Sequence, residues 1–217
     1  MLDLIIPVFK NIPGLYRTLA SIGTDFESDS LYVTIVDDAS GDNYDEVISL
    51  YKKFFPIRVV SLPTNCGPGV ARQTGFYCTK EPYVTFIDCG DVFSAPHMLQ
   101  KMMNTVEVNP DCVFFSWAHG EENANGETSV VSSGHNRMHG KIYKRSFLEE
   151  YDIRFSEISP KANEDIGFNM NCRMCAASYS LAHSCNALFS SEEPAIIWKW
   201  SGPSIVRAND CAFYYKD

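Results

Sequence analysis

Short apolar runs alternate with helical patterns over the first ninety residues, and this alternation constrains the fold more than any other feature. The runs are rich in β-branched and aromatic residues and cover residues 2–9, 31–36, 57–62 and 83–87. After the first run, Leu15, Leu19 and Ile22 recur at the spacing of one helical face. Strand and helix in alternation are typical of a parallel sheet with right-handed crossovers. The sequence therefore predicts an α/β fold, and 217 residues are enough for one such domain.

The second half of the chain is less regular. We expect helices over residues 95–106, 145–151 and 164–177, and strands over residues 112–117, 141–143 and 195–200. Residues 121–133 are polar and rich in Gly and Asn, which favours a loop or an exposed hairpin. Nothing resembles a linker or an internal repeat, so we expect a single domain over residues 1–217.

Aspartates stand where two of the expected strands end. Asp37 and Asp38 follow the second run, and Asp88 and Asp91 follow the fourth. Ligands of parallel sheets bind beyond the carboxyl ends of the strands. Asp88 and Asp91 are suited to a Mg²⁺ or Mn²⁺ ion that also binds substrate phosphates, and Asp37 or Asp38 to a base or a ribose. Capping of turns by the same side chains is the competing interpretation.

The charge balance opposes a general polyanion binder. The chain has 27 acidic and 18 basic residues and a net charge of −9, whereas nucleic-acid binding requires a basic face. The best candidate for a local basic patch is the group Lys141, Lys144 and Arg145.

The cysteine content and the N-terminus indicate the compartment. Eight cysteines without a secretory leader favour free thiols, and the spacing of Cys172 and Cys175 from later ligands fits no common zinc finger. No apolar run approaches the ~18 residues of a membrane helix. We therefore expect a cytoplasmic protein without an integral membrane segment.

Several segments, in this order, closely resemble the family-two glycosyltransferases of the GT-A fold. They cover residues 5–11, 36–40, 69–75, 86–91, 139–145, 153–155 and 163–165. The resemblance extends from residue 2 to about residue 206. It implies a mostly parallel, Rossmann-like central sheet flanked by helices, with a smaller acceptor-side region in the second half. The nucleotide-sugar-binding half would cover about residues 1–94, and the acceptor-binding half about residues 95–217.

The resemblance also implies roles on the donor side. Pro7 and Phe9 would lie against the nucleotide base, and Asp37 or Asp38 would bind the base or its ribose. Arg72 matches the position whose guanidinium contacts the phosphates, for which its planar fork of donors is suited.

The remaining roles concern the metal and the acceptor. Asp88 and Asp91 match the metal motif, and Asp88 also belongs to the donor site. Asp165 matches the general base that deprotonates the acceptor hydroxyl. The residues expected on the acceptor side are His139, Lys141 and Glu164.

Together these roles imply an inverting transfer by single displacement. The donor would be a nucleoside-diphosphate sugar, of UDP type, and Mn²⁺ or Mg²⁺ would neutralise the leaving group. The acceptor would be a glycan or another hydroxyl compound. A hydroxyl on modified nucleic acid is an alternative that only the basic group at Lys141 favours and the net charge opposes.

Two departures from the family pattern bear on the metal. The third position of the family's Asp-x-Asp motif is Gly90, so either Asp91 takes over as ligand or metal affinity is weakened. Ser201 stands where relatives often carry a metal-binding histidine, and His183 and His139 are the possible substitutes. The departures leave open a second alternative, a catalytically degenerate protein that binds nucleotide sugars.

Overall fold

A computed structural model describes most of the chain. The described residues are 1–23, 30–115, 117–122, 128–134, 139–156, 164–180, 187–189 and 196–198. Side chains are described within residues 1–23, 30–115, 139–156 and 164–175. Asn163, His183, Cys185, Ser201 and Cys211 lie outside the described residues.

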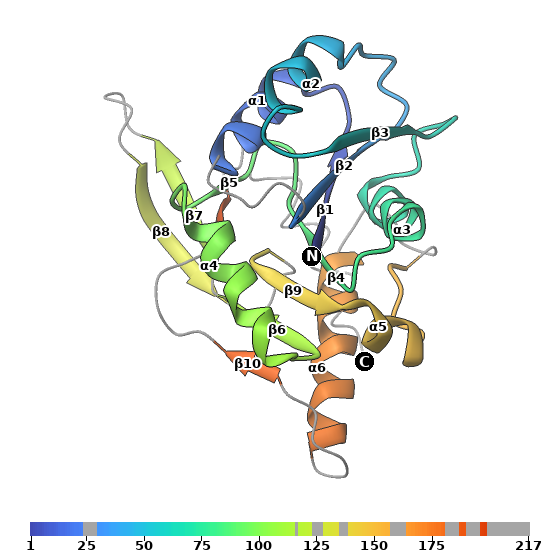
Figure 1. The fold of residues 1–217 in the computed structure, drawn as a ribbon, viewed down its shortest axis with the longest axis vertical. Helices are drawn as coiled ribbons and strands as arrows, with labels where there is room; N and C mark the ends of the chain where they lie inside the picture. The colour runs from blue at the N-terminus through green and yellow to red at the C-terminus, as the bar shows by residue number, and fades with distance from the viewer. Residues whose placement is uncertain are drawn as a thin grey trace, which may run out of the picture.

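The centre of the molecule is a seven-stranded sheet (Figure 1). Its order is β10 (Ala187–Phe189), β6 (Cys112–Phe114), β9 (Lys141–Lys144), β4 (Tyr83–Phe86), β1 (Leu2–Val8), β2 (Leu31–Asp37) and β3 (Ile57–Ser61). Strand β9 runs antiparallel to β4 and to β6, and the other pairings are parallel. The mostly parallel α/β sheet predicted from the sequence is confirmed.

Three crossover helices connect the first four strands. They are α1 (Ile12–Ser21), α2 (Asp45–Tyr51) and α3 (Pro68–Cys78). The side chain of Asn11 accepts a hydrogen bond from the amide of Gly14, and Pro13 lies in the first turn, so α1 begins with an N-cap. Every residue of β1 is buried, as expected for a parallel strand covered on both faces.

The core has two parts, one on each face of the central sheet. Leu4 and Ile6 of β1 belong to the same buried cluster as Leu15 and Leu19 of α1. Ile5, which points to the other face, belongs to a cluster with residues of α3 (Pro68–Cys78) and of α6 (Glu164–Ser180). The alternation of side chains along β1 therefore holds α1 on one face and α3 with α6 on the other.

A second, four-stranded sheet has the order β5 (Val92–Phe93), β11 (Ile196–Trp198), β7 (Trp117–Glu122) and β8 (Thr128–Gly134). Strands β7 and β8 pair antiparallel, so residues 121–122 and 128–133 of the polar segment lie in paired strands. The single strand expected over residues 112–117 is divided between β6 of the central sheet and the start of β7.

Shorter elements complete the second half. They are α4 (Met98–Asn104), a 3-10 turn (Thr105–Val108) and α5 (Arg145–Glu150). Cys172 and Cys175 lie on α6, as expected, and both are free thiols. Among the described helices, none combines the length and the apolar character needed to cross a membrane.

Candidate functional site

A groove lies at the carboxyl ends of β1, β2 and β4. Its volume is about 260 Å³, and it is lined by Pro7, Val8, Phe9, Asn11, Asp38, Pro68, Asp88 and Cys89. Phe9 is 45% exposed, and its aromatic side chain is suited to stacking on a flat ligand. The structure thus brings together four residues that the sequence analysis placed at the donor site, namely Pro7, Phe9, Asp38 and Asp88.

The carboxylates of Asp37 and Asp38 both hold loops in place. Asp37 Oδ1 accepts hydrogen bonds from the Ser40 amide at 2.9 Å and from the Tyr44 hydroxyl at 2.8 Å. The carboxylate oxygens of Asp38 accept hydrogen bonds from the amides of Cys66 at 2.7 Å and Gly67 at 2.8 Å, just before α3. Turn capping therefore describes both residues, and Asp38 in addition lines the groove.

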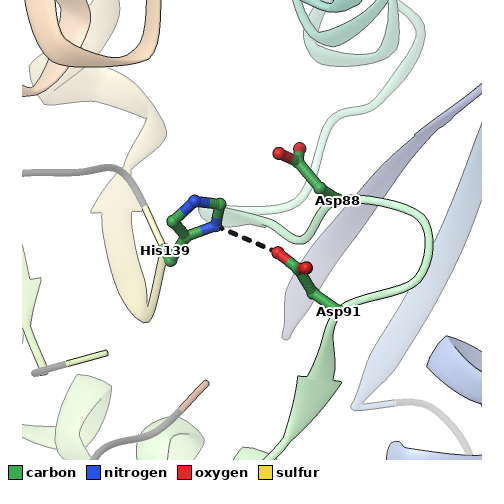
Figure 2. Close-up of side chains that lie close together, drawn as sticks. All are labelled: Asp88, Asp91 and His139. Carbon is green, nitrogen blue, oxygen red and sulfur yellow. Dashed lines mark ion pairs between the residues drawn. The ribbon is translucent and has the colours of Figure 1, made fainter. Parts of the chain in front are cut away.

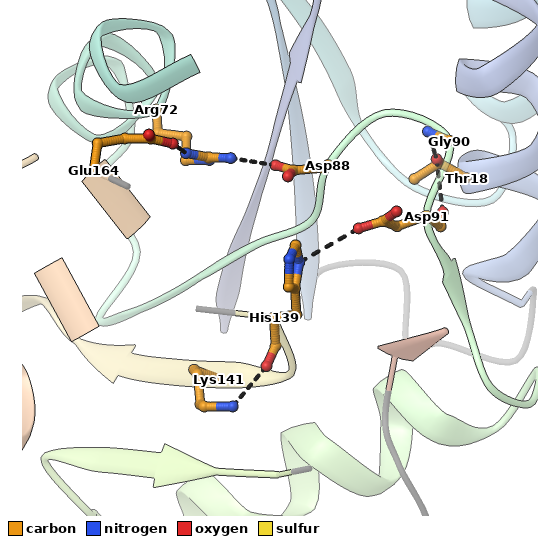
Figure 3. Close-up of polar contacts among 8 residues, drawn as sticks. All are labelled: Thr18, Arg72, Asp88, Gly90, Asp91, His139, Lys141 and Glu164. Atoms are coloured by element: carbon orange, nitrogen blue, oxygen red, sulfur yellow. Dashed lines mark hydrogen bonds and ion pairs between the residues drawn. The ribbon is translucent and has the colours of Figure 1, made fainter. Parts of the chain in front are cut away.

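The turn Asp88–Asp91 is fixed to α1 by one hydroxyl group. Thr18 Oγ1 accepts a hydrogen bond from the Gly90 amide at 2.9 Å and donates one to the carbonyl of Asp91 at 2.8 Å (Figure 3). The sequence analysis missed Thr18, which is fully buried in the structure. The available signal was a threonine three residues after Leu15 and four before Ile22, on the helical face that these apolar residues define.

The backbone at Gly90 explains why the family's acidic residue is absent there. Gly90 has φ of 106°, a conformation that glycine adopts readily and aspartate does not. In this turn the next carboxylate along the chain belongs to Asp91, which is buried and directed toward His139 (Figure 2). The structure therefore supports the option that Asp91 takes the position of the missing residue.

Arg72 links the groove to helix α6. Its guanidinium forms ion pairs with Asp88 and, at 2.6 Å, with Glu164, and its side chain is 2% exposed (Figure 3). Burial alone would lower the pKa of Arg72, but the two carboxylates raise it. Burial raises the pKa of Glu164 despite the opposing attraction of Arg72. In this structure, then, the guanidinium expected at the phosphates contacts two protein carboxylates.

Asp88, which lines the groove, forms a cluster with Asp91 and His139. A carboxylate oxygen of each aspartate and an imidazole nitrogen lie within 4.8 Å of one another, close enough to hold one metal ion (Figure 2). His139 Nδ1 is 3.3 Å from Asp91 Oδ2. Two carboxylates and an imidazole are common ligands of divalent cations, so these residues fit the metal that the sequence analysis expected.

Lys141 holds the backbone of His139, one member of this cluster (Figure 3). Its side chain is fully buried, and Nζ donates hydrogen bonds of 2.7 Å to the carbonyls of Phe115 and His139. Burial, with a contribution from nearby Arg173, lowers the pKa of Lys141 to about 7.

The best candidate for a basic patch, the group Lys141, Lys144 and Arg145, does not form one on the surface. Lys141 is buried, Arg145 pairs with buried Asp3 at 3.1 Å, and Lys144 pairs with Asp111 at 3.5 Å. The charged groups of all three residues are bound by partners within the fold: Lys141 by two carbonyls, and Lys144 and Arg145 by carboxylates. The observation that favoured a nucleic-acid acceptor is thereby removed.

Asp165 lies in the first turn of α6, next to Glu164. The residue is 8% exposed. Because Glu164 contacts Arg72 and Arg72 contacts Asp88, the first turn of α6 is connected to the groove through two ion pairs.

Comparison with protein families gives one family for most of the chain. The model described as "Glycosyl transferase family 2" matches residues 3–171.

Curated relatives include an N-acetylglucosaminyltransferase and a polysaccharide biosynthesis protein. The chain is 26% identical over 200 residues to the poly(ribitol-phosphate) beta-N-acetylglucosaminyltransferase TarP of Staphylococcus aureus. The alignment covers 82% of this chain and 59% of TarP. It is 29% identical over 123 residues to the succinoglycan biosynthesis protein ExoW of Rhizobium meliloti, covering 55% of this chain and 39% of ExoW. The chain thus spans less than two thirds of the length of these relatives.

Solved structures share the fold. The structure of S. aureus TarS 1-349 in complex with UDP superposes with a TM-score of 0.72 at 21% identity, covering 92% of this chain and 60% of that one. The mannosyltransferase PcManGT from Pyrobaculum calidifontis, in complex with GDP-Man and Mn2+, gives a TM-score of 0.63 at 16% identity, covering 97% and 61%. The GT-A fold expected from the sequence is confirmed.

Proposed function

Because the chain belongs to glycosyl transferase family 2 and is a glycosyltransferase, we propose that it transfers a sugar from a UDP-sugar to a hydroxyl group of a glycan with inversion. One observation carries the proposal. The groove with Phe9 and Asp38 and the acidic turn with Asp88 and Asp91 meet at the carboxyl ends of β1 and β4. This is where an open α/β sheet binds nucleotides.

The groove is suited to the nucleoside part of the donor. Pro7 and Phe9 offer apolar and aromatic surface, and the base would stack on the exposed ring of Phe9. A fold neighbour, TarS, has been solved in complex with UDP-GlcNAc, which supports a UDP-sugar as donor.

Asp88 and Asp91 would hold a divalent cation next to the diphosphate. When bound, Mn²⁺ or Mg²⁺ supplies positive charge that neutralises the leaving diphosphate. Arg72 orients the carboxylate of Asp88 through their ion pair. Thr18 fixes the turn so that the carboxylate of Asp91 stays in place.

Asp165 is the proposed general base. It would accept the proton of the acceptor hydroxyl as that oxygen attacks the anomeric carbon. A direct displacement inverts the configuration and requires no covalent nucleophile. The ion pairs of Arg72 with Asp88 and Glu164 hold the first turn of α6, which carries Asp165, against the donor side.

The acceptor is proposed from the relatives. TarP and TarS are named for transfer of N-acetylglucosamine to poly(ribitol-phosphate), and a hydroxyl on such a polyol or sugar polymer is the acceptor class proposed here. His139 and Lys141 do not form an exposed acceptor surface, because both side chains are buried.

Release of UDP or GDP from a panel of nucleotide sugars, measured with Mn²⁺, tests this function. We expect slow hydrolysis of one UDP-sugar without acceptor, and faster release when a polyol-phosphate or glycan acceptor is added. Binding of UDP without turnover on any donor and acceptor would favour the degenerate alternative. Turnover of a GDP-sugar alone would contradict the UDP assignment.

A further inference from the structure

We infer that His139 is the third protein ligand of the cation held by Asp88 and Asp91, and that Lys141 positions it. The inference rests on the cation of the proposed function. His139 would thus supply a metal ligand in place of the one that Gly90, which has no side chain, cannot provide.

The sheet topology brings His139 to the site. Strand β9 is antiparallel to β4, with Ile142 opposite Thr85, so the beginning of β9 lies at the carboxyl end of β4. Asp88 follows the end of β4, and His139 precedes the start of β9. The antiparallel pairing of one strand therefore places an imidazole opposite the acidic turn.

The geometry favours coordination. His139 Nδ1 lies 3.3 Å from Asp91 Oδ2, and the nitrogen and the carboxylate oxygens of all three residues lie within 4.8 Å of one another. Such separations allow one cation to contact all three at about 2.1 to 2.3 Å, after small side-chain adjustments. His139 and Asp91 are both buried, whereas Asp88 is partly open toward the groove, which leaves room for substrate oxygens.

The backbone around His139 is held by its own contacts. Lys141 Nζ donates to the carbonyl of His139 and to that of Phe115, each at 2.7 Å. The Phe115 amide in turn donates to the carbonyl of Gly140 at 2.9 Å. Groups that orient a metal ligand from behind contribute to affinity, so Lys141 is a positioning residue for the imidazole.

A simple ion pair between His139 and Asp91 is the competing explanation of the same geometry. It predicts no bond between the imidazole and a bound metal. Pulsed electron paramagnetic resonance on the full chain loaded with Mn²⁺ separates the two, because a coordinated imidazole nitrogen couples to the manganese spin.

We expect this nitrogen coupling in the wild-type protein, its loss in His139→Ala, and its retention in the control His97→Ala, whose side chain is exposed at the start of α4. Should His139→Ala fold poorly, His139→Gln keeps a side chain of similar length and lacks the imidazole. Bound Mn²⁺ without nitrogen coupling, or coupling that persists in the His139 variant, would overturn the inference.

Affinities for two metals provide a second readout. Imidazole favours Co²⁺ strongly over Mg²⁺, whereas carboxylates serve both. We expect His139→Ala to lower Co²⁺ affinity by more than about tenfold and Mg²⁺ affinity less, while a general collapse of the site would lower both equally. Lys141→Met, which keeps the apolar stem, should lower Mn²⁺ affinity by about tenfold and leave metal-free UDP binding unchanged; unchanged Mn²⁺ affinity would contradict its positioning role.

These outcomes are distinguishable from failure of the proposed function. A protein that turns over a UDP-sugar with Mn²⁺ bound but shows no nitrogen coupling retains the function and loses only this inference. A protein that shows the coupling but turns over no donor retains the metal site and contradicts the transferase proposal.

Discussion

Arg72 on α3 and Glu164 on α6 form a buried ion pair in which Nη1 and Oε1 lie 2.6 Å apart. The two residues are 92 positions apart in the chain, and the pair joins α3 to the helix that carries the proposed base. Since Arg72 also contacts Asp88, a single guanidinium connects the acidic turn with the first turn of α6.

Replacing Glu164 by Gln should destabilise the protein. The substitution removes one charge from a buried pair, which costs about 3 kcal/mol, the lower end of the range because Asp88 still faces Arg72. Urea unfolding measures the change. The matched control is Asp152→Asn, since Asp152 pairs with Arg154 at the surface, where such pairs contribute about 0 to 1 kcal/mol. Equal effects of the two substitutions would contradict the role of the buried pair.

Replacing Asp165 by Asn should abolish transfer and preserve donor binding. Loss of a general base lowers kcat by about 10² to 10⁴, whereas the nucleotide groove does not include this side chain. Transfer rates measure the loss of activity, and UDP calorimetry on the same preparation measures the preserved donor binding. Full transfer activity in Asp165→Asn would rule out this residue as the base.

Replacing Thr18 by Val should loosen the acidic turn without changing the shape of the core. The buried Gly90 amide would lose its acceptor, at a cost of about 1 to 3 kcal/mol, and Mn²⁺-dependent UDP binding should weaken. Thr105→Val is the control, because the Thr105 hydroxyl donates a hydrogen bond to the Met102 carbonyl at its own helix end, away from the acidic turn. If both variants bind UDP equally well, Thr18 does not fix the turn.

Two glycines should respond in opposite directions to an added methyl group. Gly90→Ala places alanine at φ of 106° and should cost about 1 to 3 kcal/mol, although neighbouring atoms leave ordinary contact distances. Gly167 lies inside α6 with open space around it, so Gly167→Ala should stabilise by up to about 1 kcal/mol. Thermal unfolding of both variants tests the contrast. If Gly90→Ala is as stable as the wild type, the backbone conformation does not explain the absence of an acidic residue at position 90.

The regular half of the fold was predictable because its signals are local. Strands β1 to β4 are apolar runs of ordinary length separated by helical patterns, and Asn11 with Pro13 marks a helix start. Strands β5 and β10 have two and three residues, which is too short for any periodicity. Their pairing depends on partners far along the chain.

The candidate site was predictable in its acidic residues and not in its contacts. Asp88 and Asp91 follow a buried strand, and this position is visible in the sequence. The pairing of Arg72 with Glu164 and the approach of His139 to Asp91 arise from the packing of α6 and from the antiparallel direction of β9. Neither leaves a local pattern. The φ angle that excludes an acid at Gly90 likewise appears only in the folded turn.

Calorimetric titration of UDP with and without Mn²⁺, on the wild type and on Asp91→Ala, tests the central claim most directly. The claim is that the turn at Asp88–Asp91 holds a cation that binds the donor diphosphate. We predict that Mn²⁺ strengthens UDP binding to the wild type by at least about tenfold and has no effect on Asp91→Ala, while metal-free binding is the same in both. An equal effect of Mn²⁺ on the two proteins would contradict the metal site, although the fold and the family would stand.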